Sequence, residues 1–197
     1  MRPQALDIIH DEHQALAAVL RSLKMLLAQA DRDGTAPPFD VLRAMLFYVD
    51  EFPERLHHTK ETELLFSRLR TRAPELKATL DRLDQEHARG ELAIRELQHA
   101  LLAYEVMGAP RRAAFETALE RYVAFYLAHM ALEENEVLPA AQRVLGAADW
   151  AELDSAFAAN RDPLTGKHEP DEPYRQLFKT IVMNAPAPIG LGAARTR

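Results

Sequence analysis

The 197-residue sequence contains no cysteine. Disulfide bonds, thiolate zinc sites, cysteine nucleophiles and iron–sulfur clusters held by cysteine are therefore excluded. Any metal site in this chain must use nitrogen and oxygen ligands, which histidine and carboxylate side chains supply.

The chain also lacks a long apolar run. No stretch approaches the roughly 20 residues that a helix needs to cross a bilayer. The N-terminal segment from Met1 to Asp11 has neither the basic region nor the apolar run of a secretory signal. We therefore expect a cytoplasmic protein with no membrane partner.

Positive charge is not in excess, because 24 lysine and arginine residues face 30 aspartate and glutamate residues, for a net charge of −6. Charges of both signs are interleaved along every helix candidate, so no cationic stripe is available for phosphate backbones. Nucleic acid is not expected as a partner. What the chain does have is 48% hydrophobic residues, enough for the core of one domain with an appendage.

Apolar residues recur at steps of three and four along four long stretches, which is the period of amphipathic helices. The connections between these stretches contain glycine or proline, at Gly34 to Pro38, Ala73 to Pro74 and Gly108 to Pro110. Four such helices with short turns predict an all-α fold, an antiparallel up-down-up-down four-helix bundle over residues 1–145. Pro53 lies inside the second stretch and predicts a kink one turn before His57.

Residues 146–197 are expected to form a short helical C-terminal extension. A first amphipathic helix is predicted from Trp150 to Ala159, and a second around Tyr174 to Met183. The tail from Ala185 is predicted to be irregular.

Two histidines inside the helical stretches have a glutamate four residues later: His57 with Glu61, and His129 with Glu133. Residues four apart lie on one face of a helix, so each pair offers a nitrogen and an oxygen to one point in space. Two such points suggest a dinuclear metal site. The spacing alone is not decisive, because His87 with Glu91 and His168 with Glu172 share it.

Depth in the bundle separates these pairs. His13 and His87 occupy seam positions where apolar core residues are expected. Counting from the turns at about 1.5 Å per residue places His13, His57, His87 and His129 at one level. A single buried histidine is usually hydrogen-bonded to a carboxylate or to the backbone. Four imidazoles and two carboxylates in one layer would cost several kcal/mol in desolvation unless cations pair with them. We therefore predict metal ligands at His13, His57, Glu61, His87, His129 and Glu133.

The other candidates are assigned to outer positions. His58 has Thr62 rather than a carboxylate four residues later, and is expected either next to the ligands or on a solvated face. Glu136 is expected to hydrogen-bond a ligand. A place for His58, His10 or Glu91 in the coordination sphere is left open. Surface positions are expected for His10, His99 and the pair of His168 with Glu172.

Four segments together resemble the hemerythrin-like (HHE cation-binding) family: EHQAL around His13, HHTKETELLF from His57, QEHARGE around His87 and HMALEENEVLP from His129. They follow in family order over about residues 5 to 145. The resemblance implies a four-helix bundle around an oxo- or hydroxo-bridged di-iron centre. It also implies that the four histidines are terminal ligands and that Glu61 and Glu133 bridge the two iron ions.

The chain departs from the oxygen-carrying hemerythrins, which have a His-x3-His pair on the third helix. Leu83 and Glu91 stand four residues before and after His87. One imidazole is therefore missing from that pattern, and reversible oxygen carriage is not implied. Imidazole with carboxylate suits iron, while manganese and zinc remain compatible.

Three functions follow from such a centre. The first is a non-haem di-iron protein that binds or senses a small ligand, namely dioxygen, nitric oxide or peroxide. The second is a catalase-like enzyme that decomposes peroxide, with Tyr122, Tyr126 or His58 as its acid or base. The third is an iron-responsive interaction module whose segment from Gly146 packs on the bundle when metal is bound. The first ranks only slightly above the second, so enzymatic activity is left open, and no protein partner is identified.

Overall fold

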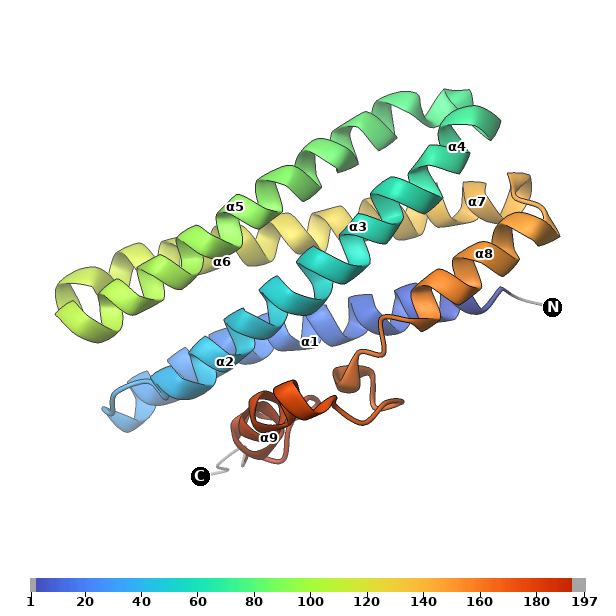
Figure 1. Ribbon diagram of the computed structural model, residues 1–197. Helices are drawn as coiled ribbons and strands as arrows, with labels where there is room; N and C mark the ends of the chain where they lie inside the picture. The colour runs from blue at the N-terminus through green and yellow to red at the C-terminus, as the bar shows by residue number, and fades with distance from the viewer. Residues whose placement is uncertain (1–2, 193–197) are drawn as a thin grey trace.

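The structure is a computed structural model that describes residues 3–192. These residues are predominantly helical and include no β-strand, which confirms the predicted all-α class. Figure 1 shows the long helical stretches lying side by side. Within the described range, no helix is both long enough and apolar enough to span a membrane.

The first two helical stretches carry half of the predicted ligands. Helix α1 covers Gln4–Asp33 and ends at Gly34, whose φ of 62° is the left-handed conformation that favours glycine at a helix end. The second stretch is continuous from residue 39 to residue 72. It consists of α2 (Phe39–Val49), the π-helix η1 (Asp50–His57), α3 (His58–Lys60), the π-helix η2 (Glu61–Phe66) and α4 (Ser67–Arg72).

The next two helical stretches carry the other three predicted ligands. A 3₁₀ turn, η3 (Pro74–Leu76), leads into α5 (Lys77–Met107). After Gly108 the chain continues through α6 (Ala109–Leu132), the π-helix η4 (Glu133–Val137) and α7 (Leu138–Val144).

The C-terminal part lies along α1 and α2. Helix α8 (Ala147–Ala158) packs on α1, and α9 (Arg175–Asn184) packs on α2, with the 3₁₀ turns η5 (Pro163–Thr165) and η6 (Glu172–Tyr174) between them (Figure 1). The division into residues 1–145 and 146–197 stays a prediction. Residues 1–2 and 193–197, which include the end of the predicted irregular tail, lie outside the described residues.

The apolar core is divided into two clusters. On α1, residues 5–9 belong to one cluster and residues 16–27 to the other, with His13 between them. The second stretch crosses from one cluster to the other at His57 and Glu61. Helix α5 crosses at His87, and the last stretch crosses at His129 and Glu133. Each stretch therefore places its predicted ligands at the same break in the core.

Three π-helical segments adjoin this break. Pro53 lies inside η1, where a normal α-helix would bring its ring against the carbonyl group four residues earlier. The wider i→i+5 turn accommodates it, so the predicted distortion before His57 takes the form of a π-helix. Glu61 begins η2 and Glu133 begins η4, and π-helical turns occur frequently at functional sites.

Candidate metal centre

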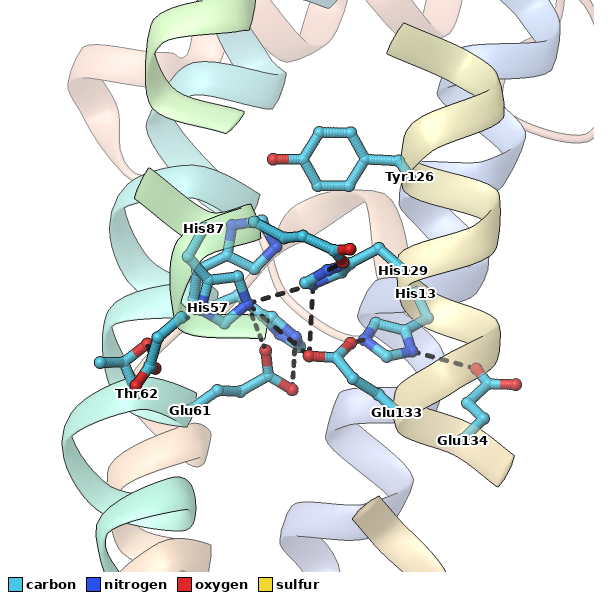
Figure 2. A network of polar contacts seen from close by, with 12 residues as sticks. His13, His57, Glu61, Thr62, His87, Tyr126, His129, Glu133 and Glu134 are labelled. Atoms are coloured by element: carbon cyan, nitrogen blue, oxygen red, sulfur yellow. Dashed lines mark hydrogen bonds and ion pairs between the residues drawn. The ribbon is translucent and has the colours of Figure 1, made fainter. Parts of the chain in front are cut away.

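The six predicted side chains meet in the break between the two core clusters (Figure 2). All six are buried, with exposed fractions between 0 and 7%. They come from α1, from η1 and η2, from α5, and from α6 and η4: His13, His57, Glu61, His87, His129 and Glu133.

The two carboxylates stand between two pairs of imidazoles. Glu61 Oε1 lies 3.2 Å from His57 Nε2, and its Oε2 lies 3.5 Å from His87 Nε2. Glu133 Oε2 lies 3.4 Å from His13 Nε2, and its Oε1 lies 3.3 Å from His129 Nε2 and 3.6 Å from His87 Nε2. Each carboxylate therefore turns one oxygen toward the His13–His57 pair and the other toward the His87–His129 pair.

The atoms at the centre are suited to cations. His57 Nε2 and all four carboxylate oxygens of Glu61 and Glu133 are buried without a hydrogen-bond partner. Buried polar atoms are nearly always hydrogen-bonded, because desolvation without a partner costs free energy. The Nε2 atoms of His87 and His129 also face each other at 3.1 Å. This donor set of imidazole nitrogens and carboxylate oxygens fits the binding of metal cations.

Each of the four histidines turns its other ring nitrogen outward to a hydrogen-bond acceptor. Such a bond fixes the tautomer and the orientation of a metal-binding imidazole. Thr62 accepts from His87 while its own hydroxyl donates to Asp84. The four contacts are His13 Nδ1 to Glu134 (3.0 Å), His57 Nδ1 to Glu12 (2.7 Å), His87 Nδ1 to Thr62 (2.9 Å) and His129 Nδ1 to Glu86 (2.9 Å).

Comparison with known families agrees with this geometry. The model of the hemerythrin HHE cation binding domain matches residues 4–141, more than half of the chain. The chain belongs to this family. No curated protein and no solved structure matched. The protein is therefore a hemerythrin-like cation-binding protein with a buried cluster of histidine and glutamate side chains.

A fifth imidazole, that of His58, lies beside the six predicted side chains, and its place was left open by the sequence. His58 is buried, so the alternative of a solvated face is wrong. One of its ring nitrogens lies within 4.8 Å of ligand atoms of Glu61, His87 and His129. Its ring stacks on that of His87 with centroids 4.3 Å apart. The missed signal was Glu54, four residues before His58 rather than after it, which lies 3.1 Å from His58 Nδ1.

The expectation for Glu136 is also wrong. Its side chain is exposed and accepts a hydrogen bond from Thr79 at 3.0 Å instead of contacting a ligand. Glu134, which the sequence analysis did not select, bonds to His13 in its place.

The remaining outer residues lie away from the centre. Glu91 is exposed and pairs with Arg95. His10 is partly exposed and lies 3.5 Å from Glu134. Surface positions are observed for His99, His168 and Glu172, as predicted.

Two acceptors that the sequence analysis missed follow a common pattern. Glu12 precedes His13, and Glu86 precedes His87. In each Glu-His dipeptide the histidine faces the centre, while the glutamate bonds to a histidine of the following helical stretch, His57 or His129. The Glu-His dipeptide followed by His-x3-Glu therefore occurs twice along the chain, and it could have identified both acceptors.

The electrostatics of the site couple the imidazoles to the carboxylates. Burial alone would lower the pKa of His129, but the carboxylates of Glu133, Glu86 and Glu61 together outweigh it and raise that pKa to about 9. The pKa of His57 is raised well above its ordinary value for the same reason, through Glu61 and Glu12. Burial opposes ionisation of Glu133 as well, yet the contact with His129 holds its pKa well below the usual range. His58 differs, because burial and the nearby His87 both lower its pKa.

Two tyrosines and a buried carboxylate lie beside His58. Glu54 Oε1 accepts hydrogen bonds from the hydroxyl groups of Tyr122, at 2.8 Å, and of Tyr126. Burial raises the pKa of Glu54 to about 7, although both hydrogen bonds act in the opposite direction. Gly90 on α5 leaves the space that the Tyr126 hydroxyl occupies, since a Cβ atom there would lie 1.9 Å from its oxygen.

Small spaces adjoin the centre on two sides. One is a cavity beside His13 and His57 whose volume of about 10 Å³ suits a water-sized molecule. Residues of both the bundle and the C-terminal part line it, including Phe52 and Asn160. The other is an open groove of about 230 Å³ that reaches His58 and His87 from the surface.

Proposed function

We propose that the protein holds two iron ions in this centre and binds or senses a small ligand, namely dioxygen, nitric oxide or peroxide. The observation that carries the proposal is the position of Glu61 and Glu133. Each carboxylate turns one oxygen to either histidine pair, and none of their four oxygens has a hydrogen-bond partner. Two anionic bridges and flanking imidazoles offset the repulsion between two dications held close together.

Iron is the favoured metal because mixed imidazole and carboxylate ligands suit it, and manganese and zinc are the alternatives. A pair of iron ions would supply open coordination positions and a change of oxidation state for small-ligand chemistry. The protein residues would orient the ligands through the outward Nδ1 contacts. The apolar clusters on both sides of the break would limit the access of water.

We also infer that the four stretches form an antiparallel up-down-up-down bundle. In that arrangement each stretch contributes one or two of the predicted ligands at the same level. The order in which the stretches pass the two core clusters supports it. Along the chain, helices α1 and α5 both run from the core cluster that contains Leu6 and Leu80 to the core cluster that contains Leu20 and Leu97. The other two stretches pass in the opposite order.

The proposal is tested by elemental analysis together with the ultraviolet–visible spectrum of the purified protein. We expect close to two iron ions per chain and an absorption band that changes reversibly when dioxygen or nitric oxide is added and removed. Manganese or zinc in place of iron would change the metal assignment. The proposal would be overturned if the protein bound fewer than two metal ions, or if its iron spectrum did not change on addition of dioxygen, nitric oxide or peroxide.

His58 is proposed as the fifth imidazole, on the side of His87 and His129. Replacing His58 by alanine is expected to weaken retention of one iron ion by at least about 10- to 100-fold, because loss of even an outer-shell partner of a metal ligand typically has an effect of that size. The measurement is iron release to a chelator, followed by absorbance. Replacing the exposed His99 by alanine is the matched control and is expected to leave release unchanged. Identical release from both variants would remove His58 from the coordination sphere.

Peroxide decomposition is the second candidate. It is favoured by the hydrogen-bonded group of Glu54, Tyr122 and Tyr126 next to His58, because such a group can hold and pass a proton beside the centre. Evolution of dioxygen after addition of hydrogen peroxide to the iron-loaded protein would support this candidate. A reversible spectral change without turnover would support binding or sensing instead.

A further inference from the structure

We propose that Asn160, which follows α8 in the C-terminal part of the chain, is a positioning residue for His57 and acts through Glu12. This inference rests on the metal centre proposed above, but not on which small ligand binds there. Asn160 lies outside residues 4–141, the segment that the family model matches. Asn160 would therefore add a hydrogen bond to the residues that surround the metal ligands, from a part of the chain outside the matched segment.

The contacts form a chain from the extension to the centre. Asn160 Nδ2 donates a hydrogen bond to Glu12 Oε2 at 3.0 Å. The same oxygen accepts from His57 Nδ1 at 2.7 Å, and His57 Nε2 faces Glu61. Asn160, Glu12 and His57 are all buried, so these hydrogen bonds are shielded from bulk solvent. The position of Asn160 therefore restricts the orientation of the Glu12 carboxylate, which restricts the tautomer and the ring orientation of His57.

The orientation of the Asn160 amide is itself fixed. Its Oδ1 accepts a hydrogen bond from Lys60 Nζ. Because a lysine ammonium can only donate, the amide oxygen must face Lys60 and the NH₂ group must face Glu12. Lys60 lies in α3, within one helical turn of both His57 and Glu61.

The turn that carries Asn160 is held tightly against the bundle. Arg161 has a φ of 48°, an uncommon conformation for a residue other than glycine. The residues on either side of it are both buried and bonded inward, Asn160 to Glu12 and Asp162 to the Tyr48 hydroxyl at 2.6 Å. One turn earlier, the buried ring of Phe157 lies edge-on to His57 with centroids 5.8 Å apart. The extension therefore contacts His57 directly through Phe157 and indirectly through Asn160 and Glu12.

The effect should be confined to one half of the centre. The outward partners of the other three histidines, Glu134, Thr62 and Glu86, all lie within the matched segment. Of the two histidine pairs, only the His13–His57 pair includes a ligand whose partner is bonded to Asn160. Loss of the Asn160 contact would then weaken one metal position more than the other.

The test compares Asn160→Ala with Asn184→Ala, a matched control in the same extension whose side chain is exposed. Each full-length protein is loaded with iron, its metal content is measured, and release to a chelator is followed by absorbance. Loss of a partner in the outer layer typically weakens metal binding by 10- to 100-fold. Because Asn160 acts one bond farther out, we expect one of two iron equivalents to leave on the order of 10-fold faster in Asn160→Ala. The second equivalent should be released at the wild-type rate, and Asn184→Ala should match the wild type.

A double-mutant cycle distinguishes positioning from general loosening. If Asn160 acts through Glu12, then Asn160→Ala should have little further effect in a Glu12→Gln background. Unchanged release in Asn160→Ala would overturn the inference while leaving the proposed function intact. The inference would also fail if both iron equivalents left faster in parallel with a lower melting temperature, or if the two substitutions were additive. A wild-type protein without two bound metal ions would overturn the proposed function and this inference together.

Discussion

Replacing Glu133 by alanine is expected to abolish binding of the iron pair, leaving less than one equivalent per chain. Glu133 is fully buried at the start of η4, and its two oxygens face His13 on one side and His87 and His129 on the other. Without this anion, two dications would face each other across Glu61 alone. In the metal-free protein the same substitution leaves imidazoles with raised pKa values without their partner, and removing one member of a buried ion pair costs about 3–5 kcal/mol.

Two further variants make this result interpretable. Glu136→Ala removes an exposed carboxylate from the same π-helical segment and is expected to retain two iron ions. Glu133→Gln keeps the volume of the side chain but removes its charge, so loss of iron there cannot be attributed to a cavity. The measurement is elemental analysis after gel filtration, with circular dichroism to check the fold. Two iron ions in folded Glu133→Ala would contradict the bridging role.

The depth of the site could be predicted from the sequence because helices have a fixed rise. On α1, the only break in the apolar seam between Ile9 and Leu16 is filled by His13. The same count along the other stretches leads to His57, His87 and His129, and the structure places all four at the break between the core clusters. Periodicity within one helix was sufficient to place each of these residues.

The outer contacts could not be predicted in the same way, because they connect different helices. Glu12 on α1 bonds to His57, and Glu86 on α5 bonds to His129. Which glutamate reaches which histidine depends on the rotation of neighbouring helices, and periodicity within one helix does not determine it. Asn160 is still harder to predict, since 148 positions separate it from Glu12 in the sequence.

The misplacement of Glu136 has a local cause. The expectation for Glu136 assumed that the seam continues with an unbroken α-helical period, whereas Glu136 lies inside the π-helix η4. A π-helical turn includes an extra residue, so the face that each following residue presents shifts. Glu136 accordingly lies exposed and accepts a hydrogen bond from Thr79 on α5. His58 is buried beside His57, which is one of the two positions expected for it.

Replacing Gly90 by alanine is expected to destabilise the protein, which is the opposite of the usual effect in a helix. Inside an exposed helix this substitution stabilises by up to about 1 kcal/mol, because alanine has the higher helix propensity. Gly90 is buried in the middle of α5, and an added Cβ would lie 1.9 Å from the Tyr126 hydroxyl oxygen and 3.0 Å from Glu54 Oε2. The Tyr126 ring is only 1% exposed and cannot swing into solvent. Overpacking of this kind costs about 1–3 kcal/mol, so the clash outweighs the gain in propensity.

A second substitution tests whether the tyrosine hydroxyl is the cause. Tyr126→Phe removes the oxygen that the new methyl group would meet, along with its hydrogen bond to Glu54. In that background Gly90→Ala should cost far less, and it should stabilise if the distance to Glu54 relaxes. Urea unfolding of the four proteins gives the coupling free energy between the two positions. Additive effects would show that the new methyl group is accommodated by a shift of α5 or α6 and not opposed by the Tyr126 hydroxyl. Strong coupling would mean that a glycine on one helix and a tyrosine on the next jointly hold Glu54 beside His58, which makes the backbone of α5 part of the support for the metal centre.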